Sequence, residues 1–182
     1  MKPLLEVALK ARHVALTPLV AADIPVMFKW INNREQVLFN APYRPVSDGQ
    51  HAAWFEAIQQ QKDTVIFGIR LLKKGNLIGS CQLRSINPIH RTAELQIRLG
   101  EIREGRQGYG TEAIRLLLDF AFKDLNLYRV SVHVFVTNEA ALRLYEKVGF
   151  VREGVLRKAA YIDGQHVDMA VMGILREEHV GR

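Results

Sequence analysis

The sequence has little cysteine: Cys81 is the single one in 182 residues. One thiol can form no intramolecular disulfide and no cysteine-based metal cluster. The six histidines contain no His-x-x-x-His pair, so we expect no metal site. A lone cysteine suits a reducing compartment. In the middle of an expected strand, Cys81 should be a small buried apolar residue.

Long hydrophobic runs are also lacking. No window approaches the roughly 18–20 apolar residues that a membrane helix needs. At the N-terminus, Glu6, Lys10 and Arg12 interrupt the apolar residues, which argues against a signal peptide. We therefore expect a cytoplasmic protein without a membrane partner.

Clusters of one charge are lacking as well. Lys and Arg number 25 against 19 Asp and Glu, a formal charge of +6, yet no run of five Lys or Arg occurs. Positive charge spread in this way favours anions only mildly. We expect no nucleic-acid partner, because no basic segment is interleaved with stacking aromatics. A phosphorylated cofactor would satisfy the same preference.

What is present is an ordinary globular composition, with 48% hydrophobic and 24% charged residues. The length suits one domain over residues 1–182, and no repeat or linker is visible. The pattern of apolar and polar residues predicts strands at 12–19, 64–72, 77–83, 92–99, 129–136, 150–158 and 166–174. The last two should form a hairpin through an Asp163-Gly164 turn.

Helices are predicted from Asp23, from Ser47 with a capping box to Gln50, after a Gly-rich loop at 104–110, and from Asn138 to Gly149. Residues 32–35 and 42–45 are expected to be irregular. Only the crossovers after residues 99 and 136 could join parallel strands. The fold class is therefore α/β (α+β): a mixed, mostly antiparallel twisted sheet of about seven strands flanked by about four helices.

The loop at 104–110 is the first functional signal. Gly105, Gly108 and Gly110 precede a helix that opens with Thr111. Glycines let the backbone approach a ligand, and the free amides of a helix start attract anions. No Gly-Lys-Ser/Thr follows, so this is not a Walker loop. Taken alone, such a loop is a simple tight turn about as often as a phosphate site.

A second motif follows after one strand: Asn138-x-x-Ala141-x-x-x-Tyr145-x-x-x-Gly149-Phe150. Together the two motifs resemble the acetyl-CoA-binding half, about residues 92–150, of the GNAT N-acetyltransferase superfamily. The segment from Phe150 to Met172 resembles its RimJ/RimL-like branch. So do Trp30-x-Asn32 and His51-x-x-Trp54-Phe55, particularly in amino-sugar N-acetyltransferases.

This resemblance implies a GNAT-type fold and acetyl-CoA as cofactor, with coenzyme A as product and an amine as acceptor. In the family, the strand before the loop splays from its neighbour and offers backbone amides. The implied cofactor-binding residues are Gln96, Ile97, Arg98, Arg103, Arg106, Gln107, Gly108, Tyr109, Gly110, Thr111, Asn138, Ala141 and Tyr145. Gly105 departs from the family's usual Gln or Arg, and Arg103 or Arg106 is expected to substitute.

The resemblance also implies catalytic roles. Tyr145 is the expected acid, because a phenol of pKa ~10 is protonated at neutral pH and can donate to a departing thiolate; its alternative is a core tyrosine. Glu94 is the expected base, with a solvated carboxylate as the alternative reading. His51 is a rival base or a packed histidine. The expected substrate-binding residues are Trp30, Asn32, His51 and Trp54, with a core role as the alternative for the two tryptophans.

The leading hypothesis is an acetyl-CoA-dependent N-acetyltransferase, and the alternative is a non-catalytic acyl-CoA sensor or scaffold on the same fold. Three acceptors stay open: a protein N-terminal amine, a small polyamine or antibiotic amine, and an amino sugar on a nucleotide. The charge of +6 mildly disfavours a polycation. A homodimer is the commonest assembly of such chains.

Overall fold

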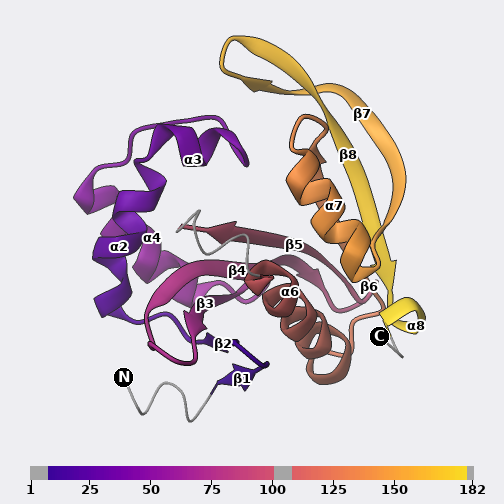
Figure 1. Cartoon of the computed structure of the whole chain (residues 1–182), viewed down its shortest axis with the longest axis horizontal. Helices are drawn as coiled ribbons and strands as arrows, with labels where there is room; N and C mark the ends of the chain where they lie inside the picture. Colours follow the sequence, from indigo (N-terminus) through magenta and orange to yellow (C-terminus); the bar gives the residue numbers. More distant parts are fainter. Residues whose placement is uncertain (1–7, 101–107, 180–182) are drawn as a thin grey trace.

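The computed structural model describes residues 8–100 and 108–179. In this part of the chain, eight strands form one sheet in the order β1-β2-β3-β4-β5-β6-β8-β7 (Figure 1). All neighbours are antiparallel except β5 and β6. The strands are β1 (Leu9–Lys10), β2 (Val14–Thr17), β3 (Val65–Leu71), β4 (Leu77–Asn87), β5 (Thr92–Leu99), β6 (Arg129–Phe135), β7 (Val151–Ile162) and β8 (Gln165–Leu175).

The expected mixed, mostly antiparallel sheet is confirmed, with eight strands in place of about seven. The additional strand, β1, is only two residues long, too short to show a period of its own. The crossover after residue 99 does join the parallel pair β5 and β6. The crossover after residue 136 also joins parallel strands, since β6 and β7 are both antiparallel to β8, which lies between them.

The α-helices of the described residues are α2 (Ile24–Ile31), α3 (Arg34–Leu38), α4 (Asp48–Gln60), α6 (Tyr109–Asp119), α7 (Glu139–Val148) and α8 (Arg176–His179). The capping residues in the sequence predicted the start of two of these helices correctly. The Ser47–Gln50 capping box begins α4. Asn138 caps α7, which ends at Gly149 with φ +118°.

Two local expectations were wrong. Residues 32–35 are not all irregular, because Asn33 accepts a hydrogen bond from the Gln36 amide and begins α3. Asp23 does not cap α2 with its side chain. The Asp23 carboxylate is buried against the Arg70 guanidinium (2.6 Å) and accepts from the Val20 amide (3.0 Å). A contact with a residue 47 positions away overrides the local preference.

The main core lies between the sheet and α6. The predicted apolar side of α6 is confirmed, since Ile114, Leu117 and Leu118 are fully buried against strand residues such as Leu16 and Leu83. A smaller cluster joins α2 to the start of β4 through Met27, Trp30 and Leu77. Figure 1 shows α2, α3 and α4 grouped on one side, across from α7 and the long β7–β8 hairpin.

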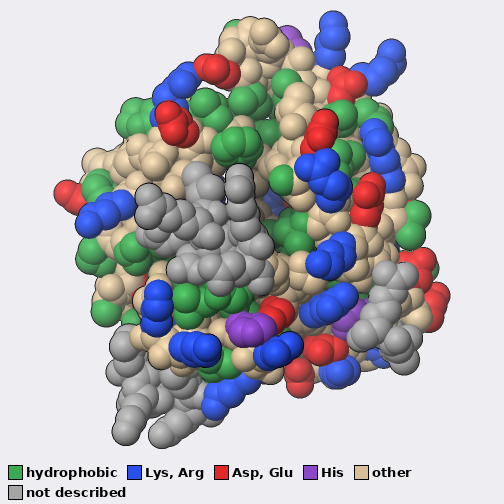
Figure 2. All heavy atoms as spheres, viewed as in Figure 1, with side chains coloured by type: hydrophobic (Ala, Val, Ile, Leu, Met, Phe, Trp, Pro, Cys, Tyr) green, Lys and Arg blue, Asp and Glu red, His purple; other side chains and the backbone are tan. Residues whose placement is uncertain are grey.

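Surface charge on the face in Figure 2 is mixed, with Lys and Arg side chains interspersed with Asp and Glu. None of the helices within residues 8–100 and 108–179 has the length and apolar character needed to cross a bilayer.

Candidate active site

The parallel strands β5 and β6 separate halfway along their length. Their pairing covers Thr92 to Glu94 on β5, opposite Arg129 to Ser131 on β6. Both strands continue beyond it, to Leu99 and Phe135. The second half of β5 therefore presents an edge without strand pairing on its β6 side.

Strand alternation decides which amides point into this opening. The Gly100 amide donates to the Ile78 carbonyl (2.9 Å), in the same register as the pairs between β4 and β5. In an antiparallel ladder every second residue of a strand belongs to a hydrogen-bonded pair. Because Gly100 is in such a pair, Arg98 and Gln96 are as well, and their N–H groups face β4. Within the expected segment Gln96–Arg98, the amide directed into the opening is that of Ile97.

A cavity of about 90 Å³ lies at this opening. Its walls come from β5, β6 and α7, closed by Phe39 and Asn40 after α3. Among the expected site residues, the cavity brings together Glu94, Gln96, Ile97, Asn138, Ala141 and Tyr145.

Tyr145 is 5% exposed and forms an edge-to-face contact with Phe150, with ring centroids 5.3 Å apart. Burial, with a smaller contribution from Cys81, raises the pKa of its phenol. Tyr145 is therefore compatible with both interpretations from the sequence. It packs in the core, as a structural tyrosine would, and it lines the cavity with a phenol that is protonated at neutral pH, as a catalytic acid would. Cys81 itself is buried, as expected.

The side chain of Asn138 forms its hydrogen bonds with backbone groups. Its Oδ1 accepts from the Ala141 amide (3.1 Å) and its Nδ2 donates to the Phe39 carbonyl (3.0 Å). An amide nitrogen carries two N–H donors, so one remains without a partner among the described residues. The contact to Phe39 fixes the end of α3 beside α7.

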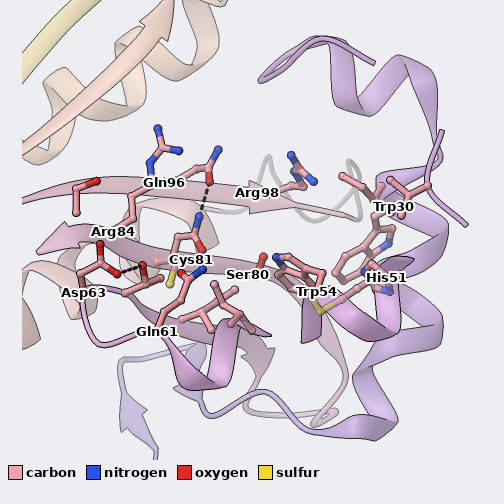
Figure 3. Close-up of a pocket in the computed structure, with 18 residues that line it drawn as sticks. Trp30, His51, Trp54, Gln61, Asp63, Ser80, Cys81, Arg84, Gln96 and Arg98 are labelled. Carbon is pink, nitrogen blue, oxygen red and sulfur yellow. Dashed lines mark hydrogen bonds between the residues drawn. The ribbon is translucent and has the colours of Figure 1, made fainter. Parts of the chain in front are cut away.

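A larger cavity of about 610 Å³ lies on the α2–α4 side. Its floor is a row of polar side chains on β4 and β5, namely Ser80, Gln82, Arg84, Gln96 and Arg98 (Figure 3). Gln82 donates to Gln96 across the strands (2.6 Å). Arg84 and Gln96 line both cavities, so the two cavities adjoin at these two side chains.

Glu94 stands beside this junction. Its Oε1 accepts from Arg84 (2.6 Å) and lies 3.3 Å from Nδ1 of His133. No described residue hydrogen-bonds Oε2, so this oxygen is available to an amine or a water. The Glu94 side chain is 21% exposed. It is thus less exposed than the solvated surface carboxylate that the sequence offered as the alternative to a catalytic base.

His51, Trp30 and Trp54 meet at the other end of the larger cavity (Figure 3). His51 stacks on Trp54, with ring centroids 5.3 Å apart, and its Nδ1 is buried without a described partner. Burial lowers the pKa of His51 against an opposing effect of Asp48. The ring is therefore neutral at pH 7 and able to accept a proton or hydrogen bond.

Asn32, also expected to bind substrate, lines neither cavity. Its amide donates to the Val46 carbonyl (3.0 Å) and accepts from the Val46 amide (2.9 Å). This pairing fastens the end of α2 to the segment before α4, so the structure gives Asn32 a structural role.

The glycine-rich loop is described only from Gly108 onward, and Arg103, Arg106 and Gln107 lie outside the described residues. Gly108 precedes α6 with φ +81°. Gly110 and Thr111 are buried, whereas Tyr109 is half-buried with its ring 6.2 Å from that of His13. An anion could approach the first amides of α6 at Gly108, where a Cβ would meet no atom within 4 Å.

Replacing Gly108 by alanine should weaken acetyl-CoA binding by about tenfold, because the left-handed conformation costs an L-residue ~1–2 kcal/mol and the methyl group occupies the ligand's approach. Gly164→Ala is the matched control, since Gly164 has φ +83° in the β7–β8 turn and equally open space. Isothermal titration measures both affinities. If the two variants bind acetyl-CoA with equal affinity, the pyrophosphate does not bind at the start of α6.

Gly100→Ala should unfold at lower urea concentration, with a loss of about 1–3 kcal/mol. A Cβ at Gly100 would lie 1.9 Å from Cε2 of Trp30, so the indole must move. The chain's two tryptophans, Trp30 and Trp54, both line the larger cavity, so fluorescence reports the shift. Gly49→Ala has open space and serves as control. If the two variants are equally stable, Trp30 does not pack on Gly100.

Sequence reasoning missed the contributions of Ser80, Gln82 and Arg84 to the cavity floor. A signal was present, because polar and apolar residues alternate in 80–84 as they do in 94–98. Phe39 and Asn40 were missed because they follow α3, a helix that the sequence analysis did not predict.

The chain matches the family described as "Acetyltransferase (GNAT) domain" over residues 13–151. Spermidine N(1)-acetyltransferase of Vibrio cholerae is 41% identical over 107 residues, which span 59% of this chain and 61% of that protein. The uncharacterized N-acetyltransferase YokL of Bacillus subtilis is 31% identical over 74% of each chain.

A crystal structure of spermidine N-acetyltransferase from Vibrio cholerae, in complex with CoA and spermine, superposes with a TM-score of 0.84. Its sequence is 32% identical, and the match covers 92% of this chain and 98% of that one. The family match spans well over half of this chain, and the fold agrees with it. The chain therefore belongs to the acetyltransferase (GNAT) domain family.

Proposed function

We propose that this protein is an acetyl-CoA-dependent N-acetyltransferase that moves an acetyl group to a primary amine by direct attack of the amine on the thioester. The observation that carries the proposal is the opening between β5 and β6, which is lined by Tyr145 and adjoins a larger cavity at Arg84 and Gln96. A thioester and an amine entering from opposite sides would meet at this junction.

The residues at the opening fit a pantetheine arm. The edge of β5 offers the Ile97 amide, which can donate to the arm or to the thioester carbonyl, where negative charge develops during attack. Acetyl-CoA would supply the acetyl group as a thioester. The first amides of α6, after Gly108, would bind its pyrophosphate, and Asn138 would contribute its remaining N–H.

Proton transfers complete the reaction. Oε2 of Glu94 takes a proton from the attacking amine, directly or through a water, while Arg84 holds Oε1. The Tyr145 phenol gives its proton to the sulfur as the carbon–sulfur bond breaks, and regains one from solvent. His51 is the second candidate for the base, since its neutral ring lines the acceptor cavity.

Within the family, we place the chain in the RimJ/RimL-like branch, on the basis of its motifs at 30–55 and 150–172. A cytoplasmic location, a single domain over residues 1–182 and a homodimer stay predictions from the sequence. The alternative, a non-catalytic acyl-CoA sensor, needs no acid at the opening. The presence of Tyr145 there disfavours it.

Two measurements test the proposal. Isothermal titration should detect acetyl-CoA binding, and the absence of binding at high micromolar concentration would rule the function out. Thiol release from acetyl-CoA should then depend on an added primary amine. Binding without release across a broad amine panel would favour the sensor.

A further inference from the structure

Arg98 is a cation on the wall of the larger cavity without a carboxylate partner among the described residues. Its side chain projects from β5 on the same side as Glu94 and Gln96. Arg98 is half-buried, and this burial lowers the pKa of its guanidinium. A desolvated guanidinium is costly unless an anion or acceptor pairs with it.

The other charged groups around the cavity do not neutralise Arg98. Arg84 is already paired with Glu94 at 2.6 Å. Asp63 is exposed and accepts from Thr64, and Figure 3 places it with Arg84 at the end of the cavity away from Arg98. Because water screens an exposed carboxylate, none of the charged groups that the structure describes around the cavity neutralises Arg98.

The surroundings of Arg98 suit a compact ligand with an apolar or ring-shaped body. Trp30 is 6% exposed, and Trp54 stacks on the neutral His51 at the same end of the cavity (Figure 3). The volume of about 610 Å³ lies within the range of pockets for small molecules.

We propose that the acceptor is a small primary amine that also carries an anionic group, a carboxylate or a phosphate, and that Arg98 binds this anion. This inference rests on the proposed acetyl transfer and names its acceptor class. The reacting amine lies at the junction of the cavities, beside Arg84 and Gln96, and the anion lies at Arg98. A polyamine would place positive charge against an unpaired guanidinium, so this chain differs in acceptor from the spermidine acetyltransferases that it resembles.

Matched amines test the acceptor class. Phenylalanine and 2-phenylethylamine differ by a carboxylate, and glucosamine 6-phosphate and glucosamine differ by a phosphate. In at least one pair, the anionic member should have a kcat/KM at least about tenfold higher, the effect of one charge-assisted pair. The pair that responds identifies carboxylate or phosphate. Preference for spermidine or for the neutral members overturns the proposal.

Arg98→Gln should reduce the ratio of kcat/KM within the responding pair by about tenfold. Arg98→Lys should restore part of the ratio. Arg152→Gln, at an exposed position on β7 that lines neither cavity, should change nothing. An unchanged ratio in Arg98→Gln contradicts the role of Arg98.

A binding measurement separates this inference from the proposed function. With coenzyme A saturating its own site, inorganic phosphate should change the fluorescence of Trp30 and Trp54, with sodium chloride as the ionic-strength control. Arg98→Gln should need about tenfold more phosphate. No response to phosphate, together with no turnover of either anionic amine, overturns the inference even where acetyl-CoA binds. Failure of acetyl-CoA to bind overturns the proposed function instead.

Discussion

Replacing Glu94 by glutamine should lower kcat by ~10²–10⁴-fold, the usual effect of removing a general base. Glutamine keeps an oxygen that can accept from Arg84 but cannot take a proton from the amine. The acetyl-CoA affinity should stay within about threefold of the parent, a difference below ~1 kcal/mol. Steady-state thiol release and isothermal titration measure the two quantities.

Controls separate catalysis from stability. The Arg84 and Glu94 side chains are 46% and 21% exposed, so losing their ion pair should cost less than ~1 kcal/mol of unfolding free energy. Arg84→Gln also removes the Arg84–Glu94 ion pair but keeps the Glu94 carboxylate, so the kcat of this variant should fall much less than that of Glu94→Gln. Raising the pH should partly rescue Glu94→Gln, because the acceptor then arrives deprotonated. A rate within about fivefold of the parent would transfer the role of base to His51.

Features determined by neighbouring residues were predictable from the sequence. The capping box of Ser47 and Gln50 and the cap of Asn138 each join residues three apart. The Asp163-Gly164 turn needs only the positive φ angles that these residues adopt, +49° and +83°. The Asn138 cap placed α7, which carries Tyr145, and the alternation over residues 92–99 placed β5, which carries Glu94.

Features determined by distant contacts were not predictable. The Asp23 side chain pairs with Arg70 and therefore does not cap α2, and the Asn32 side chain hydrogen-bonds to Val46 and therefore lines neither cavity. The closure of the smaller cavity depends on a bond from Asn138 to the Phe39 carbonyl, 99 residues earlier. The polar floor was visible as alternation on each strand, but only the register of β4 against β5 sets Gln82 opposite Gln96 and Ser80 opposite Arg98.

Replacing Tyr145 by phenylalanine should lower kcat by roughly 10–10³-fold, because a thiolate leaves tolerably well even without a proton donor. The acetyl-CoA affinity should change by less than about 1 kcal/mol, since the hydroxyl acts mainly in the transition state. The packing on Phe150 needs only the ring, so the urea midpoint should be preserved.

The raised pKa of Tyr145 also gives a prediction for the pH dependence of the rate. Burial raises the pKa of Tyr145 above the ordinary value of 10.0, so the wild-type kcat should not fall through phenol ionisation up to pH 10. Phenylalanine has no proton to lose, and its rate should show no alkaline limb from this group. A purely structural Tyr145 requires the opposite result, with reduced stability and near-parental turnover. Measuring kcat and the urea midpoint on the same preparation decides between the acid and the core tyrosine.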